Sequence, residues 1–438
     1  MVNNGSRPGG LQATLEGLLS SVDVATARVL DKALAEREVS AEEGALLFQA
    51  QGPALTAVML AADALRRQAV GDVVTYVVNR NINFTNVCIK RCGFCAFSRD
   101  HREEEGYFLP MEEVLRRARE AWELGASEVC IQAGLPPKME GSLYIDLCRA
   151  IKQELPDIHI HGFSPEEVLY GAVRSRCTVE DYLRELREAG VGSLPGTSAE
   201  VLDDRIRERI SPGRISTQQW VEVITTAHRL GIPTTSTIMF GHVEEPLDRT
   251  RHLALIRDIQ KATGGFTEFV PLSFVYWEAP MYRKCLIQGV QPGPTGADVI
   301  RMHAIARIML HGHVPNIQCS WVKEGPRMAQ VLLAAGCNDL GGTLINESIS
   351  TAAGASYGQL VPPRELRRLI RDLGRTPAER GTTYQTRRLF ADGDDPVEPL
   401  DLAAQEGAGR FGSYQDILRD TRFRYTGQQT VVPVVATK

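Results

Sequence analysis

Three cysteines crowd into eight residues of this 438-residue chain, within the segment NVCIKRCGFCAF. Cys88, Cys92 and Cys95 have the spacing CxxxCxxC, whereas the other six cysteines stand singly. Soft thiolate ligands suit iron–sulfur chemistry, so three of them on one short loop can hold three irons of a four-iron–four-sulfur cluster. The fourth iron would then lack a protein ligand and could chelate the amino and carboxylate groups of S-adenosylmethionine (SAM).

Two other uses of these cysteines stay open on spacing alone. A structural zinc site takes four ligands, usually in two pairs. His101 is the nearest candidate, but it has no partner in a second pair. A conventional four-cysteine cluster would need Cys130, which falls inside a predicted strand. An odd, scattered set of cysteines also argues against disulfides and for a reducing compartment. We therefore favour the cluster that binds SAM.

Elements that could position this loop begin at residue 72, where short β-branched runs alternate with longer amphipathic stretches. The predicted strands are Val73–Val78, Glu128–Gln132, Ile158–Phe163, Gly192–Pro195, Thr234–Phe240, Glu268–Ser273, Ile317–Trp321 and Asp339–Leu344. Predicted helices between them include Met111–Leu124, Leu143–Leu155, Thr178–Ala189, Thr217–Leu230 and Pro246–Thr263. About eight such repeats predict an α/β fold, a TIM-like (β/α) barrel. The cysteines follow its first strand, at the face where barrels build active sites.

The chain divides into three predicted regions: an N-terminal helical region at 1–71, the barrel at 72–378 and an irregular, partly ordered C-terminal tail at 379–438. Removal of the tail after about residue 385 is expected to leave cluster binding intact. The helical region carries three periodic stretches, the second opened by a capping box of Ser40 and Glu43. These stretches are Leu11–Leu34, Ser40–Phe48 and Ala54–Ala69.

Composition narrows the class of protein. Hydrophobic residues make up 43% and charged residues 24%, the balance of a globular protein. A net charge of −5 argues against nucleic-acid partners and against a polybasic membrane anchor. No apolar run approaches the roughly 20 residues of a membrane helix, and the N-terminus lacks the order of a signal peptide. We expect a cytoplasmic protein with neither nucleic acid nor membrane as a partner.

The cysteine spacing, with the aromatic Phe94 before the third cysteine, resembles the radical SAM signature. Further segments, over roughly residues 60 to 380, resemble one family of these enzymes, the synthase subunits that make the deazaflavin precursor from tyrosine. They include NRNINFTNVCIKRCGFCAFSR, EVCIQAGLPPK, GVGSLPGTSAE, RISPGRIS, TTSTIMFGHVE and NDLGGTLINESISTAAG. The resemblance implies a radical SAM barrel, a 4Fe-4S cluster and SAM as cofactors.

The same resemblance implies a transferase reaction. Such an enzyme cleaves the Cα–Cβ bond of L-tyrosine and joins the 4-hydroxybenzyl fragment to 5-amino-6-(D-ribitylamino)uracil. An electron donor must reduce the cluster. A second radical SAM synthase subunit would act next in the pathway and close the third ring of the deazaflavin.

Cofactor-binding residues follow from the family pattern and from strand ends. Gln132 and Gly134 end the second strand and would contact the methionine part of SAM, although a plain turn is the alternative. Thr197 and Glu200, after the fourth strand, would meet the ribose hydroxyls. Thr197 could equally cap a helix. Phe94 would shield the cluster and touch the adenine, or simply pack.

Catalytic candidates lie at other strand ends. His161 and Glu166 near the third strand, and His242 after the fifth, could transfer protons or bind the pyrimidine. Glu166 could instead belong to the first turn of the next helix, where acids are favourable. Lys138 could pair with the tyrosine carboxylate, and residues 346–348 could bind the ribityl chain.

One segment departs from the family pattern: Tyr276 and Trp277 stand where a histidine is expected. An aromatic pair could stack on tyrosine or the pyrimidine, or mark altered substrate handling. The alternative function is that of an aminofutalosine synthase-like radical SAM enzyme of menaquinone biosynthesis. A non-catalytic iron–sulfur sensor is the alternative from another class.

Overall fold

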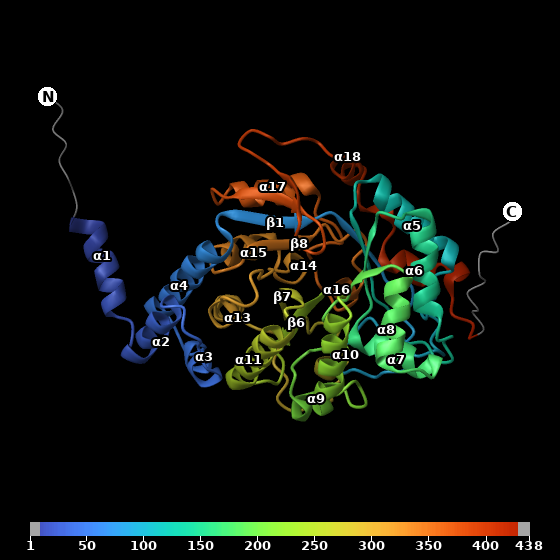
Figure 1. The fold of residues 1–438 in the computed structure, drawn as a ribbon, viewed down its shortest axis with the longest axis horizontal. Coiled ribbons are helices and arrows are strands. Elements are labelled where there is room, and N and C mark those ends of the chain that lie inside the picture. Colours follow the sequence, from blue (N-terminus) through green and yellow to red (C-terminus); the bar gives the residue numbers. More distant parts are fainter. Residues whose placement is uncertain (1–8, 428–438) are drawn as a thin grey trace.

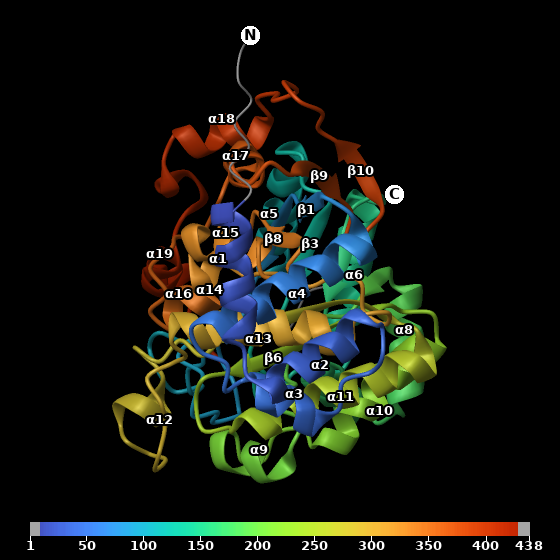
Figure 2. The ribbon, with the colours of Figure 1, turned by 90° about the vertical axis from the view of Figure 1, so that its left-hand side faces the viewer.

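The computed structural model describes residues 9–427. N-terminal helices form one end of the molecule and α5–α8 the other (Figure 1). The N-terminal layer consists of α1 (Gly9–Ser20), α2 (Val24–Leu34), α3 (Ala41–Leu47) and α4 (Pro53–Val70). In it α4 packs on α13 (Gly296–Leu310) and α3 packs on α11 (Pro246–Thr263), so the layer covers one flank of the barrel (Figure 2).

The strands are β1 (Val73–Val77), β2 (Asn79–Ile82), β3 (Glu128–Ile131), β4 (His159–Gly162), β5 (Val191–Ser193), β6 (Thr234–Phe240), β7 (Phe266–Ser273), β8 (Asp339–Gly342), β9 (Thr376–Arg380) and β10 (Thr386–Leu389). The remaining helices are α5 (Met111–Glu123), α6 (Leu143–Glu154), α7 (Pro165–Ser175), α8 (Val179–Glu188), α9 (Asp204–Ile210), α10 (Thr217–Arg229), α12 (Pro280–Arg283), α14 (Trp321–Glu324), α15 (Pro326–Leu333), α16 (Ile349–Ala352), α17 (Pro363–Arg371), α18 (Pro399–Gln405) and α19 (Tyr414–Arg419), with short 3-10 turns at Ala408–Phe411 and Thr421–Phe423.

The parallel strands close into a barrel. β2, β3, β4 and β5 are paired in that order, β6 pairs with β7, and β8 pairs with β1. Single parallel bridges join the groups: Leu194 to Thr234, Phe269 to Ile317, and Gln318 to Asp339. The consecutive strands β1 and β2 occupy one position of the ring, and the short segment Ile317–Gln318 occupies another. The ring then has eight parallel positions. The predicted TIM-like barrel is thereby confirmed.

The seventh strand is much shorter than the predicted Ile317–Trp321. Only Ile317 and Gln318 form bridges, and Trp321 already begins α14. The Trp321 indole N–H donates to the carbonyl of Gly342 at 2.8 Å, which ties this helix across to β8. A buried tryptophan that needs a hydrogen-bond partner therefore overrides the strand tendency of the apolar run.

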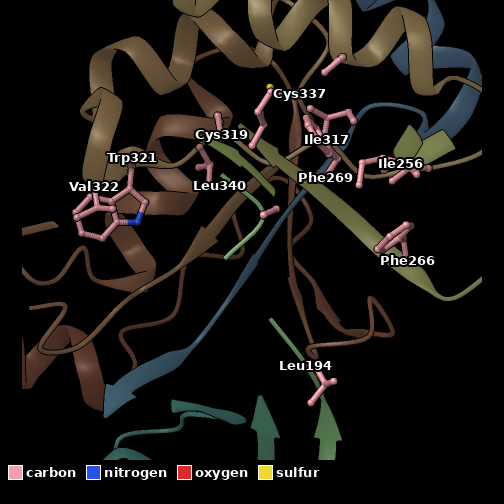
Figure 3. Packing of buried hydrophobic residues seen from close by; sticks show 14 of the residues in the cluster. Leu194, Ile256, Phe266, Phe269, Ile317, Cys319, Trp321, Val322, Cys337 and Leu340 are labelled. Carbon is pink, nitrogen blue, oxygen red and sulfur yellow. The ribbon is translucent and has the colours of Figure 1, made fainter. Parts of the chain in front are cut away.

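The core lies between the strands and the helices around them. Figure 3 shows Phe269, Ile317, Cys319 and Leu340 where β7, the seventh position and β8 run side by side. All four side chains are fully buried. Burial of a large apolar side chain contributes about 1.5–3 kcal/mol, so this region anchors the short seventh strand despite its few hydrogen bonds.

The N-terminal layer follows the sequence patterns closely, with one break. The predicted helix Leu11–Leu34 is split into α1 and α2, because the Asp23 side chain accepts a hydrogen bond from the Thr26 amide and starts a new helix. The capping box of Ser40 and Glu43 is present at the start of α3. Among residues 9–427, no helix combines the length and apolar character that crossing a bilayer requires.

The C-terminal part is more regular than an irregular tail. The predicted boundary at 378 falls inside β9, which pairs in parallel with β1, and β10 returns beside β9 as a hairpin. Two further helices, α18 and α19, follow. The sequence pattern did not indicate this hairpin. All four residues of β10 (386–389) are exposed, so this strand shows no alternation of apolar and polar residues.

A buried ion pair holds the hairpin against the barrel. Arg380, at the end of β9, donates to both carboxylate oxygens of Asp339, from Nε at 2.6 Å and from Nη2 at 3.0 Å. The hydroxyl of Tyr384, in the hairpin turn, donates to Glu268 at the start of β7 at 2.5 Å. The hairpin turn therefore packs into the lower end of the barrel, below the strand ends that carry the predicted site.

Replacing Asp339 with Asn should lower the free energy of unfolding by about 3 kcal/mol, because Arg380 would stay buried without its bidentate partner. Urea unfolding of the purified protein measures this change. A matched control is Glu365→Gln, which breaks an exposed pair with Arg368 and should cost less than about 1 kcal/mol. Equal losses in the two variants would contradict the role given to the buried pair.

Candidate active site

The cysteine loop, residues 86–99, is held by backbone hydrogen bonds from distant parts of the chain. The Ile89 amide donates to the carbonyl of Leu135 at 2.8 Å, and the Gly93 amide donates to the carbonyl of Ile210 at 2.8 Å. Leu135 follows β3 and Ile210 ends α9, so two distant segments hold the part of the loop around Cys88 and Cys92. The loop geometry does not depend on its own residues alone.

The three thiols face a common cavity of about 400 Å³ at the barrel mouth. Burial raises the pKa of Cys88, and it raises that of Cys92 to about 12, while the nearby Arg214 guanidinium acts in the opposite direction. Such thiols need a strong positive charge, such as iron, to become thiolates.

Within residues 9–427, no three His, Cys, Asp or Glu side chains lie close enough to share a single metal ion. That geometry disfavours a zinc site. In a four-iron–four-sulfur cluster each thiolate binds a different iron, so the three sulfurs need not converge on one point. Cys88, Cys92 and Cys95 therefore fit a cluster. Cys130 also lines the cavity, but its sulfur lies 3.5 Å from Gln132 Nε2.

Arg214 organises the charge beside the cysteines. Its guanidinium lies 3.2 Å from a carboxylate oxygen of Glu166 and 2.7 Å from one of Glu200. Lys90, within the cysteine loop, adds a second contact to Glu166 at 3.1 Å. The Arg214 guanidinium also lies 5.7 Å from the centre of the Phe94 ring, a cation–π distance. Phe94 is thus placed between the cysteines and this charge network.

Glu166 is held as an anion by these contacts. Glu166 lies in the first turn of α7 and also lines the cavity, so both interpretations of its position hold. Its pKa is lowered: burial alone would raise it, but Arg214 and the Ile215 amide outweigh burial. Glu200 has φ of +45°, in the left-handed region that costs a non-glycine residue energy. Backbone strain of this kind is typical of functional sites.

The predicted SAM contacts come together on one side of the cavity. The Thr197 hydroxyl donates to the Gln132 side-chain oxygen at 2.8 Å. No helix begins at Thr197, since α9 starts at Asp204, so the alternative role as a helix cap is wrong. A Cβ on Gly134 would lie 2.3 Å from the carbonyl oxygen of Val87, so only glycine allows β3 to meet the cysteine loop so closely.

His161 lies deeper, on the cavity floor. Its Nδ1 is 2.7 Å from the hydroxyl of Ser193, and its neighbour Glu128 accepts a hydrogen bond from Asn79 at 2.8 Å. Burial lowers the pKa of His161 to about 4, although Glu128 opposes this. The ring is therefore neutral near pH 7 and can donate or accept one hydrogen bond.

Other predicted residues lie outside this cavity lining. His242 is buried in the loop after β6, where its Nδ1 accepts from the Val243 amide at 2.8 Å and its Nε2 lies 3.1 Å from the Met239 carbonyl. Lys138 is exposed. Tyr276 and Trp277 stack on each other at 4.4 Å beside a second cavity of about 260 Å³.

Several charged residues of the cavity wall are not predicted from the sequence, among them Arg214, Lys90 and Lys323. Arg214 lies between two helices and not at a strand end. Lys90 lies between two of the cysteines. Lys323 lies on α14, of which only the first residue, Trp321, belongs to a predicted strand. Their positions on loops and short helices gave no periodic signal.

The C-terminal segment, residues 411–425, covers the outside of the cysteine loop. The Tyr414 ring packs on Phe97 with centroids 5.6 Å apart, and its hydroxyl donates to the Phe97 carbonyl at 3.4 Å. The Phe108 amide donates to the Phe423 carbonyl at 2.7 Å. The Tyr425 hydroxyl donates to the Pro137 carbonyl at 3.2 Å. The dispensability of the tail for cluster binding stays a prediction, and these contacts give a reason to test it.

Comparison with known proteins agrees with this geometry. A sequence model of the Radical SAM superfamily matches residues 82–256, and a model of the CofH/MqnC C-terminal region matches residues 263–392. The fold is similar to that of the FeFe-hydrogenase maturase HydG from Carboxydothermus hydrogenoformans, with a TM-score of 0.64 over 85% of this chain and 84% of that one at 16% identity. Methylornithine synthase (PylB) gives 0.63 over 80% and 97% at 18% identity.

A parallel barrel whose first strand is followed by three cysteines, together with these matches, defines a radical SAM enzyme. The chain is 51% identical to the 5-amino-6-(D-ribitylamino)uracil–L-tyrosine 4-hydroxyphenyl transferase of Methanothermobacter thermautotrophicus, over 83% of this chain and 98% of that protein. It is 46% identical to the enzyme of that name from Methanocaldococcus jannaschii, over 80% and 97%. The chain belongs to this family of transferases.

A third relative is longer. The FO synthase of Mycobacterium leprae is 48% identical over 79% of this chain, but the match covers only 40% of that protein. The chain therefore corresponds to less than half of the FO synthase.

Replacing Cys92 with Ala should abolish most iron binding, because the remaining two thiols hold only two irons of a cubane. Iron content per chain and the visible absorbance of anaerobically reconstituted protein measure it. Cys285→Ala removes an exposed cysteine outside the cavity and should keep both values unchanged. Full iron content in the Cys92 variant would rule out the assigned ligand set.

Replacing Tyr414 with Ala should speed the loss of the cluster in air, because the outer face of the cysteine loop loses an aromatic contact that contributes roughly 3 kcal/mol. Tyr414→Phe keeps the ring against Phe97 and removes only the hydroxyl, so it should behave like the unchanged protein. The decay of cluster absorbance after exposure to oxygen gives the rate. Identical rates in all three proteins would mean that the C-terminal segment does not stabilise the loop.

Proposed function

We propose that this chain cleaves the Cα–Cβ bond of L-tyrosine and joins the 4-hydroxybenzyl fragment to 5-amino-6-(D-ribitylamino)uracil. One observation carries the proposal: three cysteines on the first barrel loop face a charged cavity at the barrel mouth, in a chain that matches transferases of this name over nearly their whole length. When bound, a 4Fe-4S cluster and SAM supply the radical chemistry, in which reductive cleavage of SAM permits abstraction of a hydrogen atom from the substrate.

The residues of this chain would divide the remaining work. Cys88, Cys92 and Cys95 would hold three irons and leave the fourth open to SAM. Gln132 and Gly134 would meet the methionine part of SAM, with Thr197 and Glu200 near the ribose and Phe94 on the adenine side, as the resemblance implies. Positioning of the reacting atoms and exclusion of water are the main contributions that such a protein makes.

The two remaining catalytic candidates differ in what they could do. Glu166 has both oxygens engaged by Lys90, Arg214 and the Ile215 amide, and its lowered pKa makes it a poor acid. We therefore propose that it positions Arg214. Neutral His161 could hydrogen-bond a substrate polar group on the cavity floor. His242 is left out of the proposal because it lies outside the cavity lining.

Two partners follow from this function. The FO synthases are more than twice as long as their matched part, which supports a second synthase subunit acting on the product of this chain. An electron donor must reduce the cluster. Nine free cysteines fit a reducing compartment, and we propose the cytoplasm.

Anaerobic, cluster-loaded enzyme mixed with SAM, dithionite, tyrosine and ribitylaminouracil should yield 5′-deoxyadenosine and a hydroxybenzyl–pyrimidine adduct, both read by mass spectrometry. Cys92→Ala should yield neither. Formation of 5′-deoxyadenosine without the adduct would overturn the substrates and keep the radical class. Turnover of an enolpyruvyl substrate instead would favour the aminofutalosine-type alternative, which the CofH/MqnC match alone does not separate.

A further inference from the structure

Lys323 differs from the other lysine and arginine side chains of the cavity wall. Lys90, Arg214 and Arg380 each form a direct ion pair with an aspartate or glutamate. The Lys323 ammonium donates to the hydroxyl of Ser350 at 3.1 Å, and it forms no ion pair within residues 9–427. A cationic group facing a cavity without an anionic partner is a ready site for a ligand anion.

Glu347 is its acidic counterpart. Its side chain lines the same cavity and is only 5% exposed. One carboxylate oxygen accepts from the Ser350 amide at 2.8 Å, while the other has no hydrogen-bond partner among residues 9–427. An unpartnered buried carboxylate oxygen is costly unless something supplies a donor.

Ser350 contacts both Lys323 and Glu347, which form no direct ion pair with each other. It binds the ammonium through its hydroxyl and the carboxylate through its amide, so it stands between the two charges. The helix α14, which carries Lys323, is anchored by the buried Trp321, whose indole N–H donates to the carbonyl of Gly342.

Their surroundings favour a ligand with one charge of each sign and an apolar part. Burial lowers the pKa of the Lys323 ammonium, whereas Glu347 first, and then Glu324 and Glu200, act in the opposite direction. Glu324 lines the second cavity and not the central one. Leucine, phenylalanine, isoleucine and alanine side chains complete the nearby wall, namely Leu272, Phe274, Ile349 and Ala353.

The pair also lies away from the expected cofactor contacts. Lys323 and Glu347 follow the seventh position and β8, the eighth, whereas Gln132 and Glu200 follow β3 and β5, the second and fourth positions of the ring. An amino acid held by this pair would thus face the cofactor side across the cavity.

We propose that Lys323 and Glu347 form a clamp for the main-chain groups of an amino-acid substrate. Lys323 binds the α-carboxylate, Glu347 binds the α-ammonium group, and the apolar wall receives the side chain. This inference rests on the proposed function, which makes that amino acid L-tyrosine. It also replaces Lys138, the exposed lysine that the sequence suggested for the carboxylate.

The test is calorimetric titration of cluster-loaded enzyme with SAM but no reductant, so that nothing turns over. Three probes are used: L-tyrosine, tyramine without the carboxylate, and 3-(4-hydroxyphenyl)propanoate without the ammonium group. Unchanged enzyme should bind tyrosine at least about tenfold more tightly than either analogue, since each loses one charge-assisted contact.

Variants assign each charge to one group of the ligand. Lys323→Met should weaken tyrosine at least about tenfold and leave tyramine unchanged. Glu347→Gln should weaken tyrosine and leave the propanoate unchanged. Lys138→Met is the matched control and should alter none of the three affinities. Iron content and the midpoint of thermal unfolding show that each variant is intact.

Four outcomes overturn the clamp. Normal tyrosine binding by an intact Lys323→Met variant is one. An equal loss of affinity for tyrosine and tyramine in that variant is another. If that variant fails to fold, equal affinity of the unchanged enzyme for tyrosine and tyramine still overturns it. Unchanged enzyme that binds SAM but no tyrosine overturns the proposed function as well, whereas the first three outcomes leave that function standing.

Discussion

The site depends on one constraint: three thiols must be held apart at fixed positions before any iron joins them. The cysteine loop has no helix or strand of its own to do this. Its amides at Ile89 and Gly93 instead donate to carbonyls of Leu135 and Ile210, which belong to the segments after β3 and at the end of α9. The barrel thus sets the geometry of the ligands, and residues 411–425 cover the loop from outside.

The cysteine loop also lies beside several charged groups in the same cavity. Thiolates and two carboxylates would repel one another in a buried cavity, so a cation has to stand among them. Arg214 does this by bridging Glu166 and Glu200 and lying over Phe94. Its own pKa is raised by these anions and by Cys92, although burial opposes the rise. The cost of this arrangement is visible in the left-handed backbone at Glu200.

Much of the barrel could be predicted because its strands are short, apolar and evenly spaced. The predicted Thr234–Phe240 coincides with β6, and Glu268–Ser273 lies within β7. The β9–β10 hairpin could not be predicted, since its strand residues 386–389 are exposed and its place beside β1 is set by contacts distant in sequence, above all Arg380 with Asp339.

The site was predictable to the extent that motif and strand end coincide. The cysteines and the positions of Gln132, Thr197 and Glu200 satisfied this condition, and all of them line one cavity. His242 also follows a strand end, but its ring lies against the backbone of its own loop, at Met239 and Val243, and not against the cavity. Lys323 could not be found this way, since its position depends on where the buried Trp321 ends a strand.

Charge balance in the cavity then distinguishes the charged residues that stabilise its wall from those that could bind a ligand. Lys90, Arg214 and Arg380 are each matched by carboxylates, so these groups hold the wall together and offer little to a ligand. Lys323 and Glu347 both contact Ser350 and form no direct ion pair with each other. A protein that buries both signs of charge without pairing them loses stability unless a ligand completes the pairs. The unmatched groups are therefore the part of the wall that a zwitterionic substrate would complete.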